Sequence, residues 1–142
     1  MSTKLKIAFA CNLISVFIFT IGGLAYLFSK ELMPYHLEVL DVGWSDLNAR
    51  SQIMLLSFLK GTGLAALVPG IAMGILLFVP FQRGDAWARW AITVIGLMTL
   101  LPATYIAATL ANATGASIPW PLLLVPVFLL LLAFILSGEL RK

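Results

Sequence analysis

Residues 7–28 have the sequence IAFACNLISVFIFTIGGLAYLF, in which no side chain carries a charge. A helix that crosses the hydrocarbon layer of a bilayer needs about 20 mostly apolar residues. No water reaches the backbone in that layer, so its N–H and C=O groups must pair within the segment, as they do in an α-helix. The run is longer than the apolar core of a signal peptide, about 7–15 residues, and does not end in small residues. It therefore predicts a membrane-spanning helix that is retained.

Three further apolar stretches follow and, with the first, account for most of the chain. Hydrophobic residues make up 61% of the 142 positions and charged residues only 11%, whereas soluble domains carry roughly 25% charged residues. We therefore predict one all-α membrane domain over residues 1–142, a four-transmembrane-helix bundle. The predicted helices cover residues 7–29, 52–81, 88–111 and 119–137, and residues 30–51 form an outer loop.

The basic residues predict the orientation of this bundle. Lysine and arginine accumulate in loops that face the cytoplasm. The formal net charge is +3, but the basic side chains stand at the ends of apolar runs, which indicates orientation rather than a nucleic-acid partner. One side would hold Lys4, Lys6, Arg83, Arg89, Arg141 and Lys142, and the other would hold Lys30 and Arg50. Both termini are therefore expected in the cytoplasm, and membrane lipids are the expected surroundings.

The outer loop is the main polar segment. Between the helix breakers Pro34 and Gly43, apolar residues at positions 37, 39, 40 and 42 stand beside acidic ones, which predicts a short segment lying in the membrane interface. Ser45 suits the N-cap of the next helix. The loop also contains the only histidine, His36. One imidazole among scattered carboxylates lacks the paired ligands that zinc and copper sites usually show, so no metal site is predicted.

Lys60 is the one formal charge well inside an apolar run. An ionisable side chain at membrane depth costs about 2.5–3.5 kcal/mol on the most lenient scale, so it is a functional candidate. The structural alternative is that its long side chain reaches the outer headgroups. If Lys60 binds the polar head of an amphipathic ligand, His36 and Tyr105 are the candidates for further contacts with that head.

Small side chains predict where two helices meet. Ala66, Gly70 and Gly74 recur at four-residue intervals, which places them on one face that another helix can approach closely. Pro69 in the same helix allows a kink. No catalytic residue and no cofactor is predicted, because Cys11 is embedded in an apolar run, a G-x-S-x-G motif is lacking, and no spanning segment contains a carboxylate for proton coupling.

Three motifs carry a resemblance: PFQRGDAWARWA at residues 80–91, MPYH at residues 33–36 and Pro-Trp at residues 119–120. In these motifs, and over most of its length, the chain resembles uncharacterised small four-helix proteins of the bacterial inner membrane. The resemblance implies the architecture and a bacterial source, and it implies no activity.

Three functions follow as hypotheses. The first is a non-enzymatic accessory or structural subunit that packs against itself, as a homo-oligomer, or against a larger membrane protein complex. The second is a small binder or carrier of an amphipathic ligand, a lipid or quinone, with Lys60 at its polar head. The third, an intramembrane enzyme that modifies lipids, has the least support because the chain shows no catalytic constellation.

Overall fold

The computed structural model describes residues 2–140, which fold into helices joined by short turns. The α-helices are α1 (Thr3–Leu27), α2 (Pro34–Leu40), α3 (Ala49–Leu76), α4 (Ala86–Thr114) and α5 (Leu124–Leu136). A π-helical segment, Leu77–Phe81, continues α3, and short 3₁₀ segments occupy Trp44–Asp46, Trp120–Leu123 and Ser137–Glu139.

Four helical segments within residues 2–140 are long and apolar enough to cross a membrane. They are Thr3–Leu27, Ala49–Phe81, Ala86–Thr114 and Trp120–Glu139. The predicted all-α bundle of four transmembrane helices is therefore confirmed, and the fold is that of an integral membrane protein.

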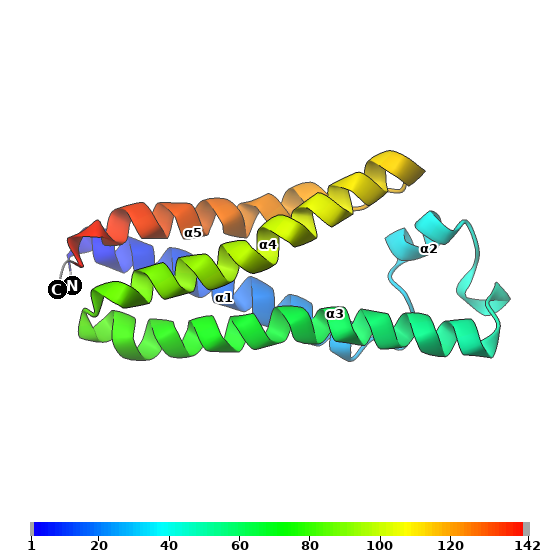
Figure 1. Ribbon diagram of the computed structural model, residues 1–142, viewed down its shortest axis with the longest axis horizontal. Coiled ribbons are helices and arrows are strands. Elements are labelled where there is room, and N and C mark those ends of the chain that lie inside the picture. The colour runs from blue at the N-terminus through cyan, green and yellow to red at the C-terminus, as the bar shows by residue number, and fades with distance from the viewer. Residues whose placement is uncertain (1, 141–142) are drawn as a thin grey trace.

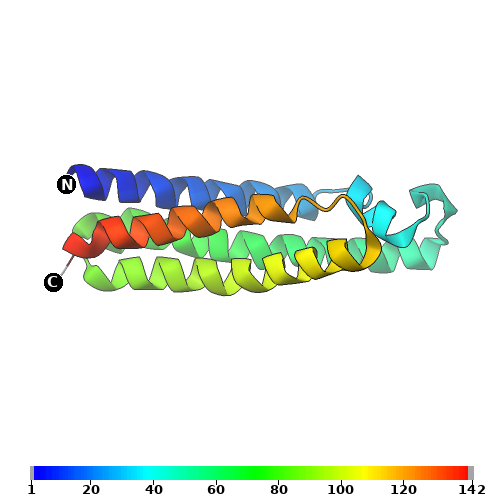
Figure 2. The same cartoon turned by 90° about the horizontal axis from the view of Figure 1, so that it is seen from above.

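The four long helices run up and down in a ring. α1 packs against α3 and α5, and α4 packs against the same two helices. Ser2 and Glu139 lie together at one end of the bundle, the terminal end, beside the turn at residues 82–85 (Figure 1). The opposite end, the loop end, carries α2 and the turn at residues 115–119 (Figure 2). Toward the loop end the ribbons of α3 and α4 diverge (Figure 1).

Capping residues set the ends of α1 and α4. The Ser2 hydroxyl oxygen accepts a hydrogen bond from the Leu5 N–H at 3.3 Å, so α1 begins at Thr3 rather than at residue 7. At the loop end of the bundle, α4 stops where Gly115 takes a left-handed conformation, with φ of 72°. Glycine carries no Cβ that would clash in this conformation, which is why it commonly follows the last helical residue.

Asn48 caps α3, so the prediction that Ser45 would do so was wrong. The Asn48 Oδ1 accepts a hydrogen bond from the Ser51 N–H at 3.0 Å. Ser45 lies instead in a separate turn, which closes where the Gly43 N–H donates to Asp46 Oδ2 at 3.2 Å. A local side-chain bond to the backbone competes with helix formation at such residues.

Pro69 does not interrupt α3, which continues as an α-helix to Leu76. The irregular turn lies further along, in the π-helical segment Leu77–Phe81, which contains Pro80. A proline has no N–H for the helical ladder, so the backbone commonly widens or bends beside one.

α1 and α3 pack with their backbones in contact at two glycines. A Cβ built on Gly23 would lie 2.7 Å from the carbonyl oxygen of Gly63. A Cβ built on Gly63 would lie equally close, at 2.7 Å, to the carbonyl oxygen of Gly23. Because these neighbours are backbone atoms, no side chain fits at either position unless one helix moves.

The small-residue face predicted on α3 lies beside this contact. A Cβ built on Gly70 would lie 3.0 Å from the Cβ of Phe19 on α1, and one built on Gly74 would lie 3.5 Å from a methyl group of Val16. Ala66 is half-buried in the same part of α3. The tightest approach is thus at Gly63, one helical turn nearer the loop end than Ala66.

The apolar core lies nearer the terminal end. Its fully buried apolar side chains include Ala8, Met73, Leu77, Ile92, Leu130 and Ala133. In the loop-end part of α4, residues 105–114, no side chain is fully buried. The packed core therefore does not extend along α4 to the loop end.

We expect alanine at Gly23 or Gly63 to destabilise the bundle by about 1–3 kcal/mol, the usual cost of forcing an extra group into a packed contact. The matched controls are Gly22→Ala and Gly61→Ala, since no described atom outside the local helix lies within 4 Å of a Cβ at either position. These controls should be neutral or slightly stabilising, because alanine favours the helix over glycine by about 0.5–1 kcal/mol. Reversible unfolding in mixed detergent micelles measures the difference, and equal effects in all four variants would contradict the backbone contact.

Candidate functional site

The segment between α1 and α3 is folded across the loop end by polar contacts. Glu38 Oε2 on α2 accepts a hydrogen bond from the Ser117 N–H, at 2.7 Å, in the turn between α4 and α5. The Gln52 side chain on α3 donates to the carbonyl oxygen of Trp44 at 2.8 Å. The acidic residue Glu38 therefore has a structural partner. Its bond holds α2 to the turn between α4 and α5, and the bond of Gln52 holds the 3₁₀ segment Trp44–Asp46 to α3.

Three aromatic rings pack where α1 ends and α2 begins. The rings of Tyr35 and His36 have centroids 4.4 Å apart, and the ring of Tyr26 meets His36 edge-on at 5.9 Å. The hydroxyls of Tyr26 and Tyr35 are hydrogen-bonded to each other. Burial, together with this hydrogen bond, raises the pKa of the Tyr35 hydroxyl, so it stays protonated at neutral pH. These contacts fix the position of the imidazole.

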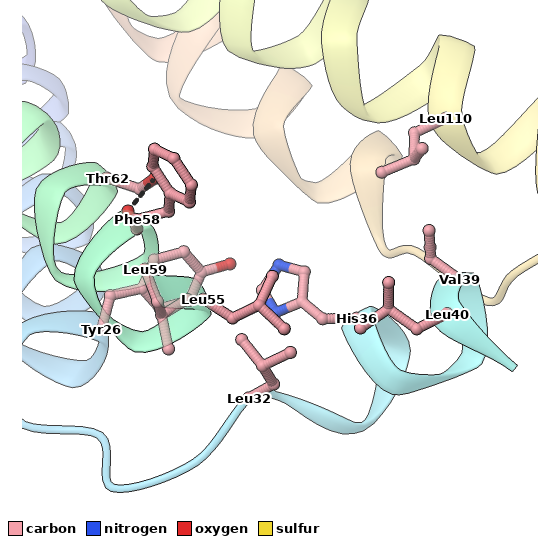
Figure 3. A pocket seen from close by; sticks show the side chains of 10 residues that line it. All are labelled: Tyr26, Leu32, His36, Val39, Leu40, Leu55, Phe58, Leu59, Thr62 and Leu110. Atoms are coloured by element: carbon pink, nitrogen blue, oxygen red, sulfur yellow. Dashed lines mark hydrogen bonds between the residues drawn. The ribbon is translucent and has the colours of Figure 1, made fainter. Parts of the chain in front are cut away.

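A cavity of about 230 Å³ lies beside this cluster, between α2, α3 and the loop end of α4. Its walls are mostly aliphatic and aromatic, with few polar atoms. The lining residues are Tyr26, Leu32, His36, Val39, Leu40, Leu55, Phe58, Leu59, Thr62 and Leu110 (Figure 3). The His36 ring projects from α2 toward α3 into this space, and Leu110 faces it from α4 (Figure 3).

His36 is the polar group of the cavity that is left without a partner. Its Nδ1 is buried and has no hydrogen-bond partner within residues 2–140. Burial lowers the pKa of the imidazole, so the ring is neutral at pH 7. A buried polar atom without a partner costs about 1–3 kcal/mol. Because Nδ1 has no surface open to the cavity, a ligand there would meet the other edge of the ring, which carries Nε2.

The other polar groups near the cavity are already engaged. The Thr62 hydroxyl donates to the carbonyl oxygen of Phe58 at 3.0 Å (Figure 3). Tyr26 is paired with Tyr35, as described above. The arrangement therefore offers one imidazole in the wall of an apolar cavity, which suits the binding of an amphipathic molecule rather than proton transfer between several groups.

Of the three ligand-binding residues predicted from sequence, the structure places only His36 in the cavity. Lys60 is exposed on α3 and is not among the residues that line the cavity. Because Gly63 packs against the last turn of α1, Lys60 lies just beyond the end of that helix, near the loop end. Tyr105 is 73% exposed on α4 and lies outside the lining as well.

Sequence reasoning missed Tyr26 and Leu110 as parts of the site. Tyr26 stands at the end of an apolar run, where an interfacial tyrosine is common and gives no sign of a ligand. Leu110 is one apolar residue among many. No group of three or more His, Cys, Asp or Glu within residues 2–140 is arranged to hold a metal ion.

Fold and site together define a four-helix integral membrane protein with a small apolar cavity at the end that carries α2. A scan against protein-family models found no match for the chain. Searches of curated proteins and of solved structures likewise found no match.

We expect the single histidine to titrate below its ordinary pKa of 6.5. The unfolded chain then binds a proton at a higher pH than the folded one, so protonation of His36 lowers the stability of the fold as the pH falls below 6.5 and has no such effect well above it. The pKa of its neighbour Tyr35 is raised by burial, so that hydroxyl stays neutral in this range. The imidazole NMR signal gives the pKa directly, and a midpoint at or above 6.5 would contradict the burial of the ring.

Thermal unfolding in detergent provides the second readout of the same effect. The unfolding temperature of the wild type should fall between pH 7.5 and pH 5.5, while that of His36→Phe, which keeps an aromatic ring, should change less.

Proposed function

We propose that this protein is a non-enzymatic membrane protein that binds an amphipathic molecule, a lipid or quinone, at the loop end of its bundle. The observation that supports the proposal is the apolar cavity between α2, α3 and α4 with the imidazole of His36 in its wall. Sites for small molecules are commonly concave and apolar, with a few placed polar groups. The hypothesis of an accessory subunit remains a prediction, and the test below distinguishes it from ligand binding.

The size of the cavity limits how much of a ligand it holds. Pockets for whole drug-sized molecules have volumes of about 300–1,000 Å³, whereas this cavity has about 230 Å³. It therefore takes a head group and the first few carbons of a chain. The rest of the chain lies outside, against the membrane-facing surface of α3, where Phe58 is 67% exposed.

We also propose that the protein lies in a bacterial inner membrane with both termini in the cytoplasm. The support is the bias of lysine and arginine toward the terminal end and the resemblance described for the sequence. The terminal-end location of both Ser2 and Glu139 fits an even number of crossings. In this orientation the cavity opens in the outer leaflet.

Filling the cavity should displace its ligand. Leu110→Trp adds a large side chain to the cavity wall, and we expect the lipid that copurifies with the protein to fall by about tenfold, a loss of about 1.4 kcal/mol in binding. The matched control is Ile106→Trp, one turn earlier on α4, because Ile106 is exposed and does not line the cavity. Native mass spectrometry counts the bound molecules in wild type and both variants.

An equal lipid count in all three proteins would overturn the binding proposal. The accessory-subunit hypothesis predicts a different result, in which a protein partner copurifies at constant stoichiometry and Leu110→Trp changes neither the partner nor the bound lipid.

Cysteine labelling tests the orientation. In a Cys11→Ser background, Ser45→Cys at the loop end should react with a membrane-impermeant maleimide added to intact cells, because Ser45 is exposed. Gln82→Cys at the terminal end is exposed as well but should react only after the cells are permeabilised. The reverse pattern would contradict the proposed orientation.

A further inference from the structure

The chemistry of the cavity restricts the head group that it accepts. Among the described residues that line it, none is Lys, Arg, Asp or Glu. An ionised group moved into an apolar site without a partner of opposite charge costs many kcal/mol, far more than a neutral polar group that is hydrogen-bonded. A phosphate head would find no cation in this lining.

We infer that the ligand is an uncharged lipid whose head is a hydroxyl or carbonyl group, and that His36 recognises this head by a hydrogen bond. The inference rests on the proposed function and narrows it from amphipathic molecules in general to neutral ones. Phospholipids, whose heads carry an ionised phosphate, are excluded from the cavity.

The hydrogen-bonding inventory favours His36 as the group that contacts the head, because the two hydroxyls of the lining already have a partner. Tyr26 is bonded to Tyr35, and the Thr62 hydroxyl is bonded to the Phe58 carbonyl. Among the residues that line the cavity, His36 has a buried Nδ1 without a partner within residues 2–140, and its Nε2 is the nitrogen open to a ligand. A neutral imidazole donates from one nitrogen and accepts at the other, so it can serve a carbonyl as well as a hydroxyl.

Lys60 does not supply the missing charge. Successive residues of an α-helix point about 100° apart around its axis. Leu59 lines the cavity, and the next residue, Lys60, is exposed and outside the lining. Its ammonium group is available to lipid headgroups on the outside of α3, which is a contact separate from the cavity.

The depth of the cavity fits a neutral head group. Tyr26, which lines the cavity, lies in the last turn of α1. A Cβ built on Gly63 would come within 2.8 Å of the Leu27 nitrogen, so the part of α3 that borders the cavity lies level with the end of α1. The ends of spanning helices lie near the boundary between hydrocarbon and headgroups. The hydroxyl or carbonyl of a neutral lipid can occupy this level while its chain stays in the hydrocarbon.

Two lipids that differ only by a phosphate provide the test. Full-length protein with ¹⁵N-labelled histidine, in detergent micelles, is titrated with dioctanoylglycerol or with dioctanoylphosphatidic acid. We expect dioctanoylglycerol to shift the imidazole signals saturably and to bind at least about tenfold tighter than the phosphatidic acid, which corresponds to about 1.4 kcal/mol. Equal binding of the two lipids would overturn the neutral-head inference and leave the proposed function standing.

Variants measured by native mass spectrometry separate recognition from folding. His36→Phe keeps the ring packing and should lose about tenfold in affinity for dioctanoylglycerol, while His36→Asn, which keeps a hydrogen-bonding group, should lose less. If Lys60→Met instead weakens binding, an ammonium contact recognises the head and the inference is overturned. If neither lipid binds and Leu110→Trp leaves the copurified lipid unchanged, the proposed function falls together with the inference.

Discussion

The backbone contact between α1 and α3 at Gly23 and Gly63 is the constraint on which the loop end depends. Inside a bilayer the helices gain little from burying apolar side chains, because lipid is as apolar as leucine, so close packing has to hold them together. Two facing glycines allow that packing near the end of α1. They place Tyr26, which follows one turn later, against α3, and the loop that starts there carries α2 back over the bundle.

At the loop end one pair of helices is in close contact and another pair separates. α1 and α3 are in backbone contact, whereas α3 and α4 diverge toward the loop end (Figure 1). Hydrogen bonds from Ser117 to Glu38 and from Gln52 to Trp44 hold the loop over this opening. The cavity is what remains between the diverging helices and the loop, and His36 enters it because its ring is packed against two tyrosines.

The structure places the three ligand-binding residues predicted from sequence in different surroundings, and one physical reason explains why the sequence did not separate them. Lys60 and Tyr105 were selected because a polar residue in an apolar run stands out, and His36 was selected as the histidine of the polar outer loop. In a lipid-solvated helix, however, the face toward other helices and the face toward lipid are equally apolar, so the periodicity of hydrophobic residues does not distinguish them. The structure places Lys60 and Tyr105 on exposed faces and His36 in the cavity. The glycines at positions 70 and 74 were predicted to face another helix, but their partners on α1 were not predicted.

Composition and the lengths of the apolar runs were sufficient for the all-α class and the four crossings, because a bilayer demands a helix wherever about 20 apolar residues occur together. Which helices touch, where they separate and which residues border the cavity came only from the tertiary structure. These features depend on contacts between residues far apart in the chain, such as Gly23 with Gly63 and Glu38 with Ser117. Hydrophobicity, which every spanning segment shares, cannot specify such pairs.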